Sequence, residues 1–336
     1  MTLRIGINGF GRIGRLTARA VYEMQRRGEI EIAAINDPGV NNVHLLKYDS
    51  VHGRAPMHIV RDSADLMHIA DDEIPRYRTR EPEEIPWKKH NVDIVLECTG
   101  KFTDKEGASK HIKAGAKKVL VSAPCTNDDI TVVYGVNHGK LKSSDIVVSN
   151  ASCTTNCLAP LVYVLHNAIG IQHGFMTTIH AYTGDQVTVD ASHKDPYRAR
   201  AAAINMIPTS TGAAKAIGRV IPELDGKLDG VSIRVPAPNV SMVDFKFTAA
   251  RKTTVEEIST AAKKAAEGAL KNILAVYDEP LVSSDFNHDP HSSIFNLNGT
   301  KIINGDFVRV MAWYDNEWGF SCRMLDTALA MHKVGY

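Results

Sequence analysis

The residue of this chain best placed to act as a nucleophile is a cysteine at the predicted start of a helix. Cys153 lies in Ser149–Cys157, which joins a short apolar strand to a helical pattern predicted over 154–169. The unpaired N–H groups and the dipole at a helix start lower the pKa of a thiol. His180 ends a later predicted strand and offers an imidazole as general base. The two residues together predict thiolate chemistry assisted by a histidine.

The other cysteines favour structural roles or carry no chemical context. Cys157 follows Cys153 by about one helical turn and is expected to face the interior, and Cys98 is expected to end a buried strand. Five cysteines without a C-x-x-C pair give little support to a disulfide framework or a zinc site. We therefore expect no metal. The two cysteines without context are Cys125 and Cys322.

A glycine-rich turn near the N-terminus predicts a dinucleotide site. Gly9, Gly11 and Gly14 form G-x-G-x-x-G directly after a predicted strand and at the start of a predicted helix. In that context the glycines let the backbone approach a pyrophosphate, and the helix start supplies N–H donors. Asp37 ends the next strand, where a carboxylate accepts hydrogen bonds from a ribose 2′-hydroxyl. The small Pro38-Gly39 pair leaves room there, so we expect NAD, with NADP use still open.

Two patterns of secondary structure follow one another along the chain. Before residue 150, strands alternate with helices, which predicts βαβ units and a parallel sheet. After it, longer strands follow one another with few helices between them, which predicts a mainly antiparallel or mixed sheet. The fold class is therefore α/β, a Rossmann-type domain followed by an α+β domain. The predicted strands are 3–7, 31–35, 93–98, 118–122, 131–136, 146–149, 175–181, 231–235, 242–249, 281–286 and 307–314, and the predicted helices are 12–27, 103–114, 154–169, 212–220, 255–270 and 317–334.

Composition excludes several classes of protein. The 336 residues include 39 Lys and Arg against 38 Asp and Glu, a formal net charge of +1. Such a balance disfavours bulk nucleic-acid binding, which shows as a strongly basic domain. No apolar run reaches the ~18 residues that a membrane helix needs. The N-terminal apolar stretch is interrupted by polar residues and does not resemble a signal peptide, so we expect a cytoplasmic protein without membrane partners.

Seven motifs distributed over the whole chain resemble those of the phosphorylating glyceraldehyde-3-phosphate dehydrogenase family. They are Ile7–Arg15, Leu46–Gly53, Ser149–Cys157, His180–Gln186, Pro208–Lys215, Arg234–Val240 and Trp313–Gly319.

The resemblance implies an activity and an architecture. It implies oxidation of D-glyceraldehyde 3-phosphate to 1,3-bisphosphoglycerate with NAD and inorganic phosphate, a step of glycolysis and gluconeogenesis, in a cytoplasmic homotetramer. It implies an NAD-binding domain over 1–151, completed by the C-terminal helix 317–336, and a catalytic domain over 152–316. The polar segment 183–203 would pack beside the cofactor of a neighbouring subunit.

The same resemblance implies roles for individual residues. Cys153 would be the nucleophile that forms a thiohemiacetal and then a thioester, with His180 as base. The cofactor residues would be Gly9, Gly11, Arg12, Ile13, Gly14, Asp37, Arg80, Ser122 and Asn316. The residues that hold the substrate or phosphate would be Ser152, Thr154, Thr183, Arg198, Thr211, Gly212 and Arg234.

Three positions depart from the family pattern. Ala191-Ser192 stands where many NAD-specific members have a proline, which weakens exclusivity for NAD. Gly184 replaces a polar residue near the nicotinamide amide, and Tyr197 replaces a common arginine. Two alternatives stay open: erythrose-4-phosphate dehydrogenase, which shares the cysteine motif, and a non-catalytic NAD-binding interaction protein. The intact Thr209–Gly212 motif suits a site that holds two phosphates, which argues against erythrose-4-phosphate dehydrogenase.

Overall fold

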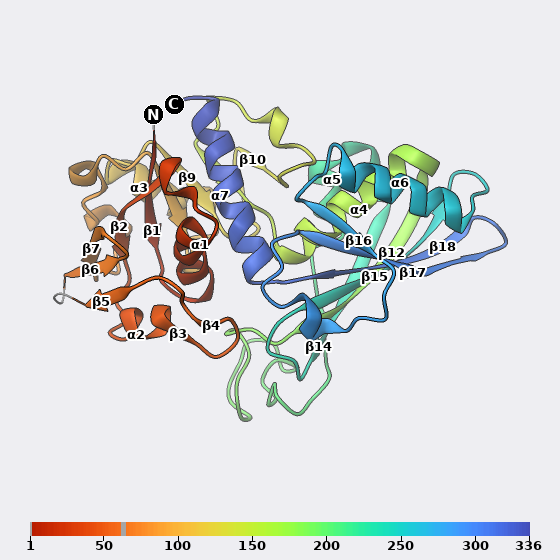
Figure 1. Cartoon of the computed structure of the whole chain (residues 1–336), viewed down its shortest axis with the longest axis horizontal. Helices are drawn as coiled ribbons and strands as arrows, with labels where there is room; N and C mark the ends of the chain where they lie inside the picture. Colours follow the sequence, from red (N-terminus) through yellow and green to blue (C-terminus); the bar gives the residue numbers. More distant parts are fainter. Residues whose placement is uncertain (1, 62–64) are drawn as a thin grey trace. The chain divides into compact units, whose positions relative to one another are not determined.

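The computed structural model describes residues 2–61 and 65–336. Its contacts divide the chain into two compact units (Figure 1). The first unit comprises residues 1–152 and 321–336, and the second comprises residues 153–320.

The first unit is built on a nine-stranded sheet with the order β10-β11-β9-β8-β1-β2-β7-β6-β5. Its central strands are parallel and nearly all apolar, as expected for strands that are covered on both faces. An antiparallel meander, β5-β6-β7, extends one edge, and β3 and β4 form a separate two-stranded ladder. The strands are β1 (Leu3–Asn8), β2 (Ile30–Asn36), β3 (Tyr48–Asp49), β4 (Gly53–Arg54), β5 (Ile59–Arg61), β6 (Leu66–Ile69), β7 (Asp72–Tyr77), β8 (Ile94–Glu97), β9 (Lys118–Val121), β10 (Ile130–Thr131) and β11 (Val147–Ser149).

Helices complete this unit. Helix α1 (Arg12–Glu23) buries an apolar stripe that includes Leu16, Ala20 and Val21, and the Asp104 side chain caps α3 (Lys105–Lys113) by accepting from Gly107 N. Helix α2 spans Asn42–Lys47. From Ser321 onward, α7 (Trp318–Lys333) belongs to this unit, where Thr327 Oγ1 donates to Asn150 Oδ1 at 2.7 Å.

The second unit is built on a seven-stranded mixed sheet with the order β13-β14-β12-β15-β18-β17-β16. Two of its strand pairs, β12 with β14 and β16 with β17, are parallel, and the other pairs are antiparallel. The strands are β12 (Ile171–Ala181), β13 (Ile207–Ser210), β14 (Leu228–Val235), β15 (Ser241–Ala249), β16 (Leu274–Tyr277), β17 (Ser293–Ile303) and β18 (Phe307–Tyr314).

Two long helices, α4 (Cys153–Ile169) and α6 (Val255–Glu267), pack against this sheet and against each other (Figure 1). Most of α4 is buried, in keeping with the apolar run over residues 157–165 between its polar first turn and His166. A short helix, α5 (Ile217–Val220), also contacts α4. The arrangement confirms the predicted fold class of a mostly parallel sheet followed by a mixed, mainly antiparallel one.

Two of the predicted strands are wrong. Residues 281–286 contain a 3-10 turn over Ser283–Phe286, because the Asp285 carboxylate accepts from Val282 N at 2.7 Å and draws the backbone into a turn. After Thr131 the strand β10 ends, because the Asn137 side chain accepts from Val133 N and donates to Thr131 O. In both places a local polar side chain replaces the hydrogen bonds of a sheet.

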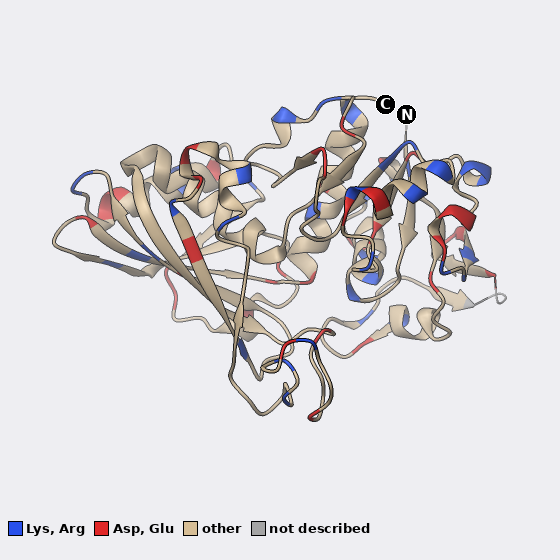
Figure 2. Cartoon of the chain, turned by 180° about the vertical axis from the view of Figure 1, so that it is seen from behind, with Lys and Arg blue, Asp and Glu red and all other residues tan. Residues whose placement is uncertain are grey.

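Basic and acidic residues are mixed along the chain, as expected from their nearly equal numbers. Lys and Arg are interspersed with Asp and Glu over the ribbon (Figure 2), and many form ion pairs, such as Arg27 with Asp72. Among the described helices, none is long and apolar enough to cross a membrane.

Candidate functional site

The glycine-rich turn in the first unit is shaped by close backbone contacts. Gly9 has φ +90°, and a Cβ there would lie 2.6 Å from Thr99 N. A Cβ on Gly14 would lie 2.1 Å from Gly9 O, so only glycine lets α1 start this close to β1. A Cβ on Gly11 would meet no atom within 4 Å, which leaves its outer side open to a ligand. These are the three separate tasks expected of the glycines in a dinucleotide turn.

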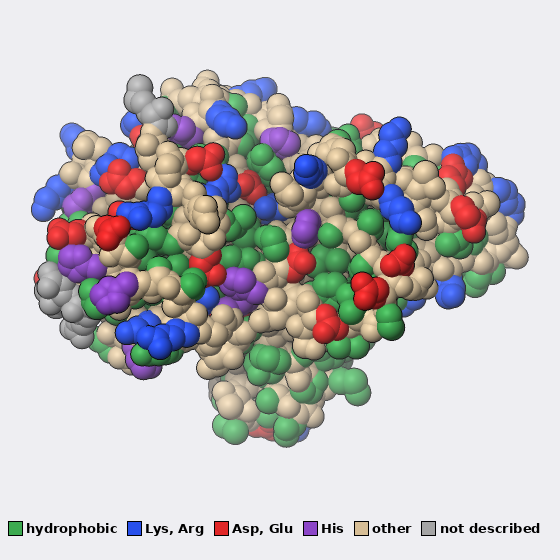
Figure 3. All heavy atoms as spheres, in the orientation of Figure 1, with side chains coloured by type: hydrophobic (Ala, Val, Ile, Leu, Met, Phe, Trp, Pro, Cys, Tyr) green, Lys and Arg blue, Asp and Glu red, His purple; other side chains and the backbone are tan. Residues whose placement is uncertain are grey.

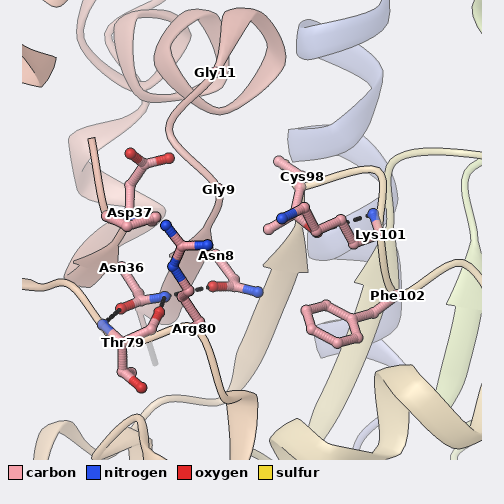
Figure 4. Close-up of a pocket in the computed structure, with 12 residues that line it drawn as sticks. Asn8, Gly9, Gly11, Asn36, Asp37, Thr79, Arg80, Cys98, Lys101 and Phe102 are labelled. Carbon is pink, nitrogen blue, oxygen red and sulfur yellow. Dashed lines mark hydrogen bonds between the residues drawn. The ribbon is translucent and has the colours of Figure 1, made fainter. Parts of the chain in front are cut away.

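A cavity of about 230 Å³ lies beside this turn. Figure 4 shows Asp37 on one wall, Cys98 and Phe102 on the opposite wall, and the side chain of Arg80 between them. The residues that line the cavity are Asn8, Gly9, Gly11, Asn36, Asp37, Pro38, Thr79, Arg80, Cys98, Thr99, Lys101 and Phe102. Cys98 is therefore a half-buried cavity residue that follows the end of β8, and the expectation that it ends a buried strand is wrong by one residue.

Asp37 is oriented by three donors. Its Oδ2 accepts from Phe10 N at 2.7 Å, and its Oδ1 accepts from Gly39 N at 2.7 Å and from Asn42 Nδ2 at 3.1 Å. A carboxylate offers about four acceptor positions, so one on Oδ2 is left for a ligand hydroxyl. The arrangement of turn, cavity and carboxylate fits the adenosine and pyrophosphate parts of a dinucleotide.

Three other predicted cofactor residues lie around the start of α1 and the end of β9, and Asn316 lies in the second unit. Arg12 pairs with Asp49, and although burial raises the pKa of that carboxyl, Arg12 and two backbone N–H groups lower it to about 2. Ile13 follows in the first turn of α1. Ser122 donates its backbone N–H to Glu97 O at 3.0 Å and hydrogen-bonds the Cys98 thiol through its side chain. Asn316 belongs to the second unit, where its Oδ1 accepts from Ser241 Oγ at 2.8 Å.

In the second unit, the first residue of α4 faces the end of β12. Cys153 Sγ lies 3.6 Å from His180 Nε2. The parallel pairing of β12 with β14 sets His180 opposite Arg234, whose Nη1 lies 2.8 Å from His180 Nδ1 and donates to Ala181 O at 3.0 Å. A thiol, an imidazole and a guanidinium are thus brought together from three elements.

Tyr314 completes this cluster, and the sequence did not assign it a role. Its hydroxyl hydrogen-bonds Thr154 Oγ1 at 2.8 Å and Thr178 Oγ1 at 2.9 Å, and its ring packs edge-on against His180. The tyrosine lies at the end of β18, within the motif Trp313–Gly319, but only the pairing of strands far apart in sequence brings it here.

The electrostatics of the cluster follow from burial and from the positive charges of Arg234 and Arg198. Burial and then the charge of Arg234 lower the pKa of His180 to about 3, so its imidazole is neutral near pH 7. Burial raises the pKa of Cys153, while Arg234 and hydrogen bonds with Thr154 lower it in part. Backbone N–H groups at the helix start do lower the pKa of this thiol, as predicted, but burial has the larger effect and raises the pKa overall. Burial also raises the pKa of Cys157, which is fully enclosed, as expected for a structural thiol.

The remaining predicted phosphate residues lie in neighbouring loops. Arg198 Nε donates to Thr209 Oγ1 at 3.0 Å and its guanidinium pairs with Asp185, yet its charge still lowers the pKa of His180. Thr183 N donates to Gln186 Oε1 at 3.3 Å. The loop with Thr211 and Gly212 lies beside the first turn of α4, where Thr155 Oγ1 donates to Ala213 O at 3.4 Å. Ser152 directly precedes α4 and is half-buried.

Comparison with known proteins identifies the family. Residues 3–105 match the glyceraldehyde 3-phosphate dehydrogenase NAD binding domain, and residues 152–316 match the glyceraldehyde 3-phosphate dehydrogenase C-terminal domain. The chain belongs to the glyceraldehyde-3-phosphate dehydrogenase family. The resemblance of the seven motifs is thereby confirmed, as is the presence of an NAD-binding domain.

The similarity to relatives in this family extends over whole chains. The glyceraldehyde-3-phosphate dehydrogenase of Cereibacter sphaeroides is 60% identical over 99% of this chain and 100% of its own length. That of Xanthobacter flavus is 59% identical over the full length of both chains, and that of Pseudomonas aeruginosa is 55% identical over 98% of each.

Proposed function

We propose that this chain oxidises D-glyceraldehyde 3-phosphate to 1,3-bisphosphoglycerate with NAD and inorganic phosphate. The observation that carries the proposal is the 3.6 Å approach of Cys153 Sγ to His180 Nε2, with Arg234 on the other side of the same imidazole. A thiol beside a neutral imidazole and a cation suits covalent catalysis on a phosphorylated aldehyde.

The ring nitrogens of His180 have separate tasks. Two contacts compete for His180 Nδ1: Ala181 O, at 2.7 Å, requires a proton on Nδ1, whereas Arg234 Nη1, at 2.8 Å, requires its lone pair. In the tautomer that donates to Ala181 O, the lone pair of Nε2 faces Cys153 Sγ. Nε2 then accepts the thiol proton as Sγ forms a bond to the aldehyde carbon, and it passes this proton to the aldehyde oxygen, which gives a thiohemiacetal and leaves Nε2 free again. Nε2 accepts that hydroxyl proton in turn when the carbon is oxidised to a thioester. Attack by a phosphate oxygen on the thioester carbon releases Sγ and forms the acyl phosphate.

The cofactor of this reaction would be held by the first unit. Gly9, Gly11, Gly14 and the start of α1 would receive the pyrophosphate, and Asp37 would accept from the adenosine ribose. When bound, NAD supplies the acceptor for the hydride of the substrate carbon. Further contacts are proposed for Arg12, Ile13, Arg80, Ser122 and Asn316. NADP is a second possible cofactor because Pro38 and Gly39 leave space beside the carboxylate.

Two anionic groups have to be held beside the thiol. Arg234 and Arg198 supply positive charge, and hydroxyl and backbone N–H groups hold oxygens without acting as competing nucleophiles. We assign the substrate phosphate to Thr183 and Arg234. The attacking phosphate and the substrate are assigned to Ser152, Thr154, Arg198, Thr211 and Gly212.

We also propose that the chain acts as a homotetramer, with residues 1–151 and 317–336 as the NAD-binding domain and 152–316 as the catalytic domain. The segment between β12 and β13 extends away from the sheet of its unit, and hydrophobic side chains cover much of it (Figures 1 and 3). Ile204 and Met206 are 79% and 77% exposed, which favours a subunit contact there. Sedimentation of the purified protein tests the tetramer, and a monomer at micromolar concentration would contradict it.

Initial rates of nicotinamide reduction test the activity. We expect turnover with glyceraldehyde 3-phosphate that requires inorganic phosphate, and loss of at least about a thousandfold in Cys153→Ser. Preference for erythrose 4-phosphate without phosphate dependence would favour the erythrose-4-phosphate dehydrogenase reading. Binding of NAD without any reduction would favour a non-catalytic role.

A further inference from the structure

A buried carboxylate accepts hydrogen bonds from two residues that line the dinucleotide cavity, Asn8 and Thr99. Glu97 is 1% exposed and is the last residue of β8. Its Oε2 accepts from Asn8 Nδ2 at 2.6 Å and from His111 Nε2 at 3.0 Å, and its Oε1 accepts from Thr99 N at 2.8 Å and from Thr99 Oγ1. A buried carboxylate is stable only when its oxygens are satisfied in this way.

The proton of His111 is fixed by a tryptophan. Trp87 Nε1 can only donate, and it lies 3.0 Å from His111 Nδ1. Nδ1 is therefore the acceptor, and Nε2 carries the ring proton that is donated to Glu97. Both Trp87 and His111 are fully buried. The three side chains make a continuous hydrogen-bonded row from the 3-10 helix Trp87–His90 through α3 to the end of β8.

The row continues across the sheet to the opposite wall of the cavity. Asn8 and Asn36 end the adjacent strands β1 and β2 in matching register, and Asn36 Nδ2 donates to Asn8 Oδ1 at 2.7 Å. Asn36 also holds the backbone of Thr79 from both sides, accepting from its N–H at 3.1 Å and donating to its carbonyl at 3.0 Å (Figure 4). Arg80 follows directly and lines the cavity.

We infer that this polar network positions the residues that line the dinucleotide cavity. The network consists of Trp87, His111, Glu97, Asn8, Asn36 and Thr79. It ties the carboxyl ends of three parallel strands to one another, and four cavity residues are members of it or bonded to it: Asn8, Asn36, Thr79 and Thr99. Glu97 is its central acceptor, so Glu97 acts on the cofactor through Asn8 and Thr99 without lining the cavity itself. The inference rests on the proposed binding of NAD by this unit.

The variant Glu97→Gln tests the network with little change in shape. Its amide would set an N–H₂ group against the donors of Asn8 and His111 in one orientation, or against those of Thr99 in the other. In either orientation one of the two cavity residues, Asn8 or Thr99, would shift. We expect the Kd of NAD, measured by titration calorimetry, to rise roughly tenfold, while kcat at saturating NAD and the KM of the aldehyde stay within about twofold. The Kd of NADP should rise by the same factor, because Asp37 keeps its donors on Phe10, Gly39 and Asn42.

A matched control separates positioning from general loss of stability. Met67 is fully buried on β6, four strands from β8 in the sheet, and Met67→Ala removes core packing there. When Met67→Ala lowers the melting temperature as much as Glu97→Gln does, we still expect its Kd for NAD to equal that of the parent. If Glu97→Gln does not fold, Trp87→Phe serves instead, since it removes the donor to His111 Nδ1 without changing a cavity residue and should also raise the Kd of NAD.

Two results would overturn the inference: an unchanged Kd of NAD in the Glu97 variant, or the same rise in Met67→Ala. A parent protein that binds NAD but does not oxidise the aldehyde would contradict the proposed reaction alone. In that case a higher Kd in Glu97→Gln would still support the network.

Discussion

Removing the charge of Arg234 should raise the pKa values of two neighbouring groups that carry opposite charges when ionised. Arg234 lowers the pKa of both Cys153 and His180, after burial has raised the first and lowered the second. A positive charge disfavours proton binding at either group, so both shifts in Arg234→Gln have the same sign. Two unit charges ~4 Å apart interact by about 4 kcal/mol at an effective dielectric constant of ~20. Because Arg234 is only partly buried, we expect roughly one to two pH units.

The rate of alkylation by iodoacetamide measures this shift at Cys153. The thiolate is the reacting form, so the pH midpoint of the rate reports the pKa of the thiol. Burial raises the pKa of both Cys98 and Cys157, so these thiols stay silent over the useful range. We expect the midpoint to move upward in Arg234→Gln and to stay near the parent value in Arg234→Lys, which keeps the charge. Equal midpoints in the parent and the glutamine variant would refute the electrostatic account.

Three further predictions follow from single contacts. Tyr314→Phe removes two hydrogen bonds to Thr154 and Thr178 and should lower the free energy of unfolding by about 2 kcal/mol in urea titrations, at ~1 kcal/mol for each bond; a loss below ~0.5 kcal/mol would contradict the role of the hydroxyl. Asp37→Ala should narrow the preference for NAD over NADP in kcat/KM, and an unchanged ratio would argue against ribose recognition by this carboxylate. The pKa of His180 is lowered to about 3 in the folded protein, against about 6.5 in the unfolded chain. The free energy of unfolding should therefore fall as the pH drops from about 6.5 toward 3, and His180→Gln should reduce this acid sensitivity.

The parts of the fold that depend on local sequence could be predicted well. The glycines after β1 and the alternation of strands with helices identify a parallel sheet, because turn chemistry and hydrophobic periodicity act over short distances. The strand at 281–286 could not be predicted correctly, since Leu281 and Val282 favour a strand while Asp285 forms a local turn. Some very short strands, such as β5 with three residues and β16 with four, were not predicted, because so few residues show no periodic pattern.

The candidate site depends on contacts that the sequence does not contain. Arg234 lies opposite His180 only because β12 and β14 pair in parallel and in that register. Tyr314 is brought to the same place by β18. The pKa of Cys153 was predicted from the helix start alone, and burial, which reverses the direction, becomes visible only once the surrounding packing is known. The roles of the individual site residues stay predictions.

The most direct test of the central claim is the identity of the atom that carries the acyl group. The enzyme is mixed with glyceraldehyde 3-phosphate and NAD in the absence of inorganic phosphate, quenched in acid and digested for mass spectrometry. The account predicts a phosphoglyceroyl thioester on the peptide that contains Cys153, formed in proportion to a single burst of nicotinamide reduction and removed by added phosphate. A burst without an adduct, or an adduct on any other cysteine, would contradict it.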